Sequence, residues 1–176
     1  MTAAATPLSI PTVDGTAKAR LLRKFEREHA TTLKILRAFP ADQASLRPNE
    51  RCNSAQQVAA TFVIEEKMLL KSLKGEQVLG GGFPSAPDSW DEILDELERT
   101  GQDIVAELQS PADANLSGTS TFFVAPKQMG EIPREAFADS MIHDQIHHRG
   151  QLSIYVRLAG AKLPSIYGPT ADEPWN

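Results

Sequence analysis

The sequence predicts an all-α fold, an antiparallel four-helix bundle that forms a single domain over residues 1–176. Three observations support this prediction. Apolar residues recur every three or four positions in four long segments, residues that cap or break helices separate those segments, and no internal repeat or low-complexity linker divides the chain. Four amphipathic helices bury their apolar faces by packing together, which favours a bundle.

The first helix is expected at about residues 14–39. Its apolar stripe advances by three or four residues and comprises Leu22, Phe25, His29, Leu33 and Leu36. Pro40 ends this helix, because proline interrupts the helical hydrogen-bond pattern. The small and polar residues 1–12 are expected to form a loose N-terminal arm.

The second helix is expected at about residues 54–73. Asn53 or Ser54 is suited to cap it, since a short polar side chain accepts a hydrogen bond from the first helical turn. One side of this helix carries Val58, Phe62, Glu65, Leu69 and Leu73. Gly75 follows, and the glycine-rich residues 80–84 predict a loop.

The third helix is expected at about residues 91–108, opened by Ser89 and Glu92 in the capping-box spacing. Its apolar face carries Ile93, Leu94, Leu97, Ile104, Val105 and Leu108. Pro111 ends it. Residues 112–132 form an irregular connection in which residues 121–124 have the composition of a short extended piece.

The fourth helix is expected at about residues 133–158, because Pro133 suits a first helical position and Gly160 suits the left-handed residue after a helix. The residues from Pro164 onward are too rich in proline and glycine to be helical. The residues expected in the core of the whole bundle include Leu36, Phe62, Leu97 and Ile154.

Composition and charge exclude several classes of function. The formal net charge is −5, from 18 basic and 23 acidic residues, which argues against a nucleic-acid partner because phosphate binding requires a basic face. No apolar run approaches the roughly 20 residues that cross a bilayer, so no membrane partner is expected. Cys52 is the only cysteine, and the first residues lack the features of a signal peptide. A cytoplasmic location is therefore expected.

A pair of histidines on the fourth helix is the main candidate for chemistry. His143 and His147 are four residues apart, so both side chains lie on one helix face and can reach one metal ion. They share a stripe with Phe137, Ile154 and Leu158, which predicts that they point into the bundle. Two interpretations remain open at this stage, namely a metal or water site and a pair of hydrogen-bonded core histidines.

The end of the chain resembles the C-terminal signature of the DinB/YfiT-like superfamily. The matching residues are His143-x-x-x-His147-His148-Arg149-Gly150-Gln151-Leu152, then residues 155–160 and residues 164–169. This resemblance implies a four-helix bundle, often dimeric, with zinc or nickel held by three histidines, one from the second helix and two from the fourth. Relatives include transferases and isomerases that use small thiols.

The chain departs from that pattern at Thr61, which matches the position of the family's histidine in the second helix. Glu65, one turn later, is the first candidate to replace it as a metal ligand, and His29 is the second. Each has a structural alternative: a surface carboxylate near Lys67 or Lys71 for Glu65, and a hydrogen-bonded core histidine for His29.

These residues predict two alternative functions. In the first, the protein has a histidine-lined pocket for a divalent metal, zinc or nickel, and is a metal-dependent hydrolase or a thiol-dependent transferase. In the second, the metal site is degenerate because of Thr61, and the protein is a non-enzymatic dimeric bundle that binds a small molecule or a partner. A small-molecule ligand and a homodimer are expected in both cases.

Overall fold

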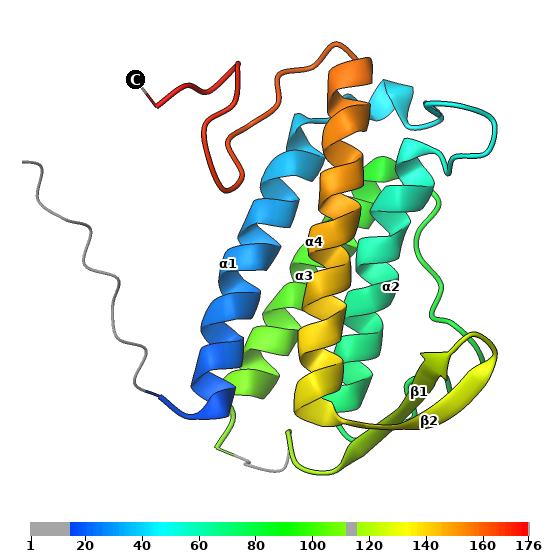
Figure 1. Ribbon diagram of the computed structural model, residues 1–176, viewed down its shortest axis with the longest axis vertical. Helices are drawn as coiled ribbons and strands as arrows, with labels where there is room; N and C mark the ends of the chain where they lie inside the picture. The colour runs from blue at the N-terminus through cyan, green and yellow to red at the C-terminus, as the bar shows by residue number, and fades with distance from the viewer. Residues whose placement is uncertain (1–14, 112–115, 176) are drawn as a thin grey trace, which may run out of the picture.

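Four long helices and one small hairpin make up the described part of the protein, shown as a computed structural model in Figure 1. The structure describes residues 15–111 and 116–175. The helices are α1 (Ala17–Ala38), α2 (Ala55–Leu73), α3 (Trp90–Gln109) and α4 (Arg134–Leu158), with a short 3-10 turn at Ala41–Gln43. Each helix lies within a few residues of its predicted segment, whereas the predicted N-terminal arm falls outside the described residues. Within those residues, no helix combines the length and apolarity that crossing a bilayer requires.

The helix ends follow the predicted capping chemistry with one difference. Ser54 and Gln57 form a full capping box at α2, in which each side chain accepts a hydrogen bond from the other residue's backbone N–H. At α3, Ser89 accepts from the backbone N–H of Glu92, but its hydroxyl also donates to the Glu92 carboxylate. Gly160 follows α4 with a φ of +72°, as predicted for a left-handed residue.

The direction of the helices differs from an antiparallel bundle. In one half of the core, the C-terminal parts of α1 and α4 pack with the N-terminal parts of α2 and α3, and the other half has the reverse arrangement. Hence α1 and α4 run one way and α2 and α3 run the other. The connection at residues 74–89 makes this arrangement feasible, because it can reach about 50 Å when extended whereas α2 is about 28 Å long. The prediction of a fully antiparallel bundle is therefore wrong for α2 and α3.

A two-stranded antiparallel sheet corrects the all-α prediction. Strand β1 (Thr119–Ala125) pairs with β2 (Gln128–Pro133), and Thr121 lies opposite Glu131. Only residues 121–124 of this hairpin were expected to be extended. Phe122 helps to attach it to the bundle, since its ring meets the buried ring of Phe137 on α4 edge-on at 5.3 Å. The fold is therefore mostly helical, with four helices and a small sheet at one end.

The core contains most of the residues expected there. Leu36, Phe62 and Leu97 are fully buried, which confirms their predicted positions, but Ile154 is 56% exposed and its prediction is wrong. On α4, the buried side passes through Met141, Gln145, Arg149, Leu152 and Val156. Of the nine buried residues of α4, two are polar, and they interrupt the apolar pattern in the middle of the helix.

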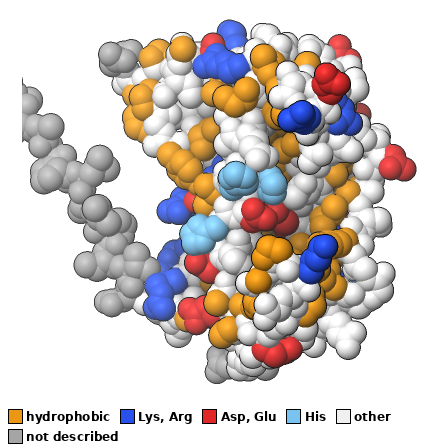
Figure 2. All heavy atoms as spheres, turned by 45° about the vertical axis from the view of Figure 1, so that its right-hand side comes forward, with side chains coloured by type: hydrophobic (Ala, Val, Ile, Leu, Met, Phe, Trp, Pro, Cys, Tyr) orange, Lys and Arg blue, Asp and Glu red, His pale blue; other side chains and the backbone are white. Residues whose placement is uncertain are grey.

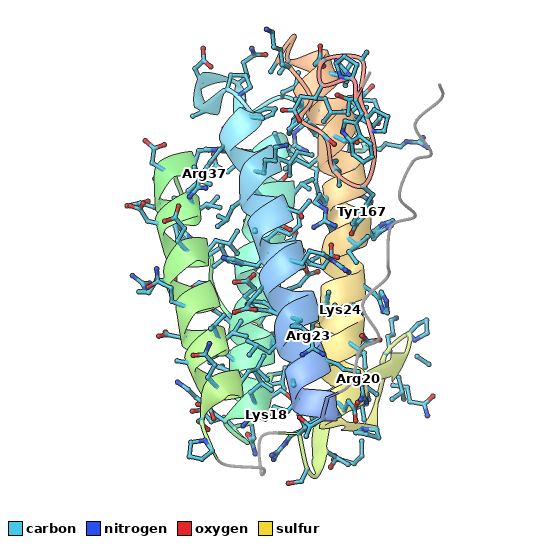
Figure 3. All side chains as sticks on the ribbon, turned by 90° about the vertical axis from the view of Figure 1, so that its left-hand side faces the viewer. Lys18, Arg20, Arg23, Lys24, Arg37 and Tyr167 are labelled. Carbon is cyan, nitrogen blue, oxygen red and sulfur yellow. The ribbon has the colours of Figure 1, made fainter. Side chains whose placement is uncertain are left out.

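The tail after α4 folds back over the C-terminal ends of α1 and α4. Figure 3 shows Tyr167 on this tail, alongside α4. Its hydroxyl contacts Glu28 of α1 and Arg149 of α4, and a salt bridge of 2.9 Å joins Lys34 to Glu173. These bonds fix the position of the tail against the two helices.

Candidate metal site

The predicted histidine pair lies on the outer side of α4. His143 has a side chain that is 61% exposed, with Lys24 Nζ at 3.1 Å and Asp139 at 3.4 Å. His147 is exposed as well, and its Nε2 lies 2.9 Å from the side-chain nitrogen of Gln151. The prediction that both histidines point inward is wrong. The reason is the register of α4, in which polar Gln145 and Arg149 face the core and turn the stripe that contains Ile154 toward solvent.

A different group of metal-ligating side chains comes together between α2 and α4. It consists of Glu65, Asp144 and His148, whose ligand atoms all lie within 4.8 Å of one another. His148 Nε2 is 3.5 Å from a Glu65 oxygen and 3.8 Å from an Asp144 oxygen. Figure 2 shows histidine and acidic side chains side by side on this face of the molecule.

These separations suit ligands of a single small cation. Zinc bonds of about 2.1 Å in tetrahedral directions place neighbouring ligand atoms about 3.4 Å apart. The two measured separations are close to that spacing. They are also too long for direct hydrogen bonds between the side chains. His148 therefore lies close to both carboxyl groups without a direct hydrogen bond to either.

Glu65 is the buried member of the group, only 2% exposed. Neither of its carboxylate oxygens has a hydrogen-bond partner among the described residues. Burial raises the pKa of Glu65 to about 10, and the neighbouring Asp144 and the charge of Glu66 act in the same direction. A buried carboxylate without a donor is unfavourable as an anion, and a bound cation is one means of satisfying it.

The orientation of His148 is set from its other ring nitrogen. Nδ1 lies 3.1 Å from the Gln151 side-chain oxygen, which fits an Nδ1–H that donates to Gln151 and an unprotonated Nε2 toward Glu65. The amide nitrogen of the same Gln151 is placed to donate to His147 Nε2. His147 thus contacts the group only indirectly, through Gln151, and a partner such as Gln151 on the other ring nitrogen is common for metal-binding histidines.

Two other residues singled out in the sequence lie outside the group: His29, the second candidate ligand, and Thr61, at the position of the family's histidine. His29 places Nδ1 at 2.7 Å from the buried carboxylate of Glu66, in agreement with the alternative of a hydrogen-bonded histidine. The Thr61 hydroxyl donates to the backbone oxygen of Gln57 at 3.0 Å. Of the predicted site residues, the structure therefore brings only Glu65 into the described cluster.

Sequence reasoning missed Asp144 and His148, although a signal for them was present. These two residues have the same four-residue spacing as His143 and His147, shifted by one position. Choosing between the two pairs required the rotation of α4 about its axis. The buried Arg149, whose partners are Glu28 and Thr32 of α1, is the residue that reveals this rotation.

Comparisons with known proteins agree with this architecture. The family model described as "DinB family" matches residues 12–175. A DinB-like protein from Bacillus cereus has a crystal structure that superposes with a TM-score of 0.64 at 23% identity, covering 84% of this chain and 95% of that one. The DinB-like protein YjoA from Bacillus subtilis gives a TM-score of 0.65 at 17% identity, covering 84% and 97%. At these identities the structural likeness concerns the fold alone.

A sequence match to a curated protein covers a smaller region. YrdA from Bacillus subtilis, described as an uncharacterized protein, is 40% identical over 43 residues. The match spans 24% of this chain and about a quarter of the length of YrdA.

Proposed function

The chain belongs to the DinB family, and on that premise we propose that it binds one divalent metal ion through Glu65, Asp144 and His148. The observation that carries this proposal is the convergence of the three side chains around a buried carboxylate with no other partner. The helices that supply these ligands are those that the family resemblance implies. One ligand comes from α2, and two come from α4 at a spacing of four residues.

The ligand set differs from three histidines in a way that affects the choice of metal. Two carboxylates and one imidazole form a harder set of donors, which is more favourable for manganese than three histidines are and which zinc also accepts. Three protein ligands also leave a coordination position free, as in catalytic rather than structural zinc sites. An ion bound there supplies Lewis-acid chemistry and lowers the pKa of a bound water or thiol.

The side chains of the protein have separate roles in this proposal. Glu65 and Asp144 contribute negative charge, and His148 contributes a neutral nitrogen whose direction is fixed by Gln151. A site with an open position is compatible with a metal-dependent hydrolase and with a thiol-dependent transferase, the two reaction classes that we propose for the chain.

The proposal is tested by metal binding to protein purified without a histidine tag. We expect calorimetry and elemental analysis to show one zinc ion per chain, and we expect Glu65→Gln and His148→Gln to weaken binding at least tenfold. His143→Gln is the matched control on the same helix, and its affinity should equal that of the original protein. Absence of zinc binding at micromolar concentrations, or an equal loss in the His143 variant, would contradict the assignment.

A non-enzymatic member of the family is the second candidate, and the state of Glu65 favours it. A carboxyl group with a pKa of about 10 is neutral at pH 7. Without an ion, Glu65 therefore adds no buried negative charge that a cation would have to balance. In this alternative the same group of side chains binds a small molecule through hydrogen bonds to His148 and Asp144. Zinc binding distinguishes the two candidates directly.

A further inference from the structure

A second concave region lies between α1 and α3, a helix pair that does not contribute to the candidate metal site. Figure 3 shows these two helices side by side, with Arg37 near one end of the seam between them. The groove has a volume of about 410 Å³, and its walls include Leu33, Val105 and Ala106. This volume is within the usual range of small-molecule sites, roughly 300–1,000 Å³.

The imidazole of His29 is held in this groove by three contacts. Its Nδ1 lies 2.7 Å from the carboxylate of Glu66, which is fully buried. Its ring stacks on Phe25, with ring centroids 5.3 Å apart. The third contact is with Gly101, where an added Cβ would lie 2.3 Å from His29 Cε1 and 2.4 Å from Nε2. Glycine at position 101 is therefore what makes room for the ring.

In this arrangement the Nδ1 atom of His29 points into the protein and the Nε2 atom lies at the groove. The bond to Glu66 is made by Nδ1, and no hydrogen bond joins Nε2 to any residue within the described ranges. The side chain of His29 is still 14% exposed and lines the groove. A carboxylate behind an imidazole fixes its orientation, a device that proteins use where the outer nitrogen must meet a ligand.

The charged residues that line the groove disfavour an anionic ligand, because two of them, Glu26 and Glu98, are acids. Arg37, a cation of its lining, forms a salt bridge of 2.6 Å with Glu98 across the seam, so it is not available to hold an anion. The apolar walls favour an apolar body, and His29 Nε2 supplies one polar anchor. A hydroxyl group suits this anchor in either protonation state, because it donates to an unprotonated nitrogen and accepts from a protonated one.

We propose that the groove between α1 and α3 is a second binding site, for a small neutral hydroxyl compound of the phenol class anchored on His29 Nε2. The site is separate from the proposed metal site, since His29 lies on α1 and the metal ligands lie on α2 and α4. It therefore does not depend on whether the protein binds metal.

The experiment is a titration of the full-length protein with phenol, followed by the NMR signals of the His29 ring. Toluene has the same shape without the hydroxyl, and benzoate replaces it with an anion. We expect phenol to shift the His29 signals in a saturable manner, with an affinity about tenfold higher than that of either control, which is the effect of one hydrogen bond of about 1.4 kcal/mol. Equal affinity for phenol and toluene, or no shift at millimolar phenol, overturns the proposal.

Variants locate the site and keep the result independent of folding. His29→Gln should weaken phenol binding about tenfold, and Gly101→Ala should do so by displacing the ring, with circular dichroism to verify the fold of each. Val105→Phe fills the groove wall from α3 and serves if either variant is unfolded, because it should abolish binding without touching His29. His143→Gln, on the exposed side of α4, should leave phenol binding unchanged. Retention of full affinity by a folded His29 or Val105 variant contradicts the assignment.

Discussion

Two buried glutamates of this protein differ in charge because they differ in partners. Burial alone would raise the pKa of Glu28, but hydrogen bonds from Tyr167, Arg149 and Arg27 outweigh it and hold the pKa below its ordinary value. Glu65 lacks such donors, and burial raises its pKa to about 10. The same side chain is thus an ion-pair member at position 28 and a neutral acid or metal ligand at position 65.

The raised pKa of Glu65 predicts that stability falls with pH. Between about 4.5 and about 10 the unfolded chain has released this proton and the folded chain retains it, so the folded state binds more protons. The free energy of unfolding must then decrease as pH rises, by at most about 1.4 kcal/mol per pH unit for this group. Urea unfolding of metal-free protein between pH 5 and pH 9 measures this slope.

Glu65→Gln is the control for that prediction, since glutamine resembles the protonated acid and does not titrate. We expect the variant to be more stable than the original protein at pH 9 and nearly equal to it at pH 5. Parallel stability curves for the two proteins would show that Glu65 ionises normally.

The buried ion pair between Arg149 and Glu28 predicts a large loss of stability when one partner is removed. Both side chains are 1% exposed, and Arg149→Met leaves the Glu28 carboxylate without its buried cation, so that only the exposed Arg27 still pairs with it. We expect a cost of about 3–5 kcal/mol in the free energy of unfolding. Tyr167→Phe removes only a hydroxyl from the same network and should cost about 1 kcal/mol. Equal losses in the two variants would contradict this account.

At the scale of the element, the register of α4 decides where the candidate site lies. Its exposed stripe carries His143, His147 and Ile154, while Arg149 and Leu152 face the core. Leu152→Ala should therefore cost about 2–5 kcal/mol, whereas Ile154→Ala should change stability by less than about 0.5 kcal/mol. Chemical denaturation at low protein concentration compares the free energies of unfolding of the two variants. A larger decrease for Ile154→Ala would show that α4 has the rotation predicted from the sequence, with Ile154 in the core.

The same helix shows what the sequence could and could not predict. Helix positions followed from periodic apolar residues and from caps such as Ser54 and Gly160, because these signals are local. The rotation of α4 did not follow, since its core side includes Gln145 and Arg149, which depend on partners in other helices. Glu65 was identified because it lies one helical turn after Thr61, where the family resemblance places a histidine, whereas Asp144 and His148 required that rotation.

The hairpin and the directions of the helices could not be predicted from local sequence patterns either. Pairing of β1 with β2 depends on a register across a turn at Lys127, which has a φ of 62° that non-glycine residues seldom adopt. Helices α2 and α3 run parallel because residues 74–89 lead the chain back along the bundle. The composition of these residues predicts a loop but not the direction in which the loop runs.

For the whole molecule, the exposed apolar side of α4 predicts a symmetric homodimer. Ile154 and Leu158 are 56% and 54% exposed, on the same stripe as His147. A two-fold contact buries the same residues on both subunits, so a single charged substitution acts twice. Light scattering should give the mass of a dimer at micromolar concentrations, and Ile154→Glu should convert it to a monomer. A monomeric original protein would reject this interface.

The pairing of α1 with α4 also has a consequence for synthesis in the cell. Arg149 bonds to a residue 121 positions earlier in the chain, and at usual translation rates roughly ten seconds separate the appearance of these two partners. Until α4 has left the ribosomal exit tunnel, the nascent protein has an open seam, and Glu28 has Arg27 beside it but lacks the buried Arg149 cation. The fourth helix brings that cation together with Asp144 and His148, so closure of the domain and completion of the candidate metal site occur in a single late event.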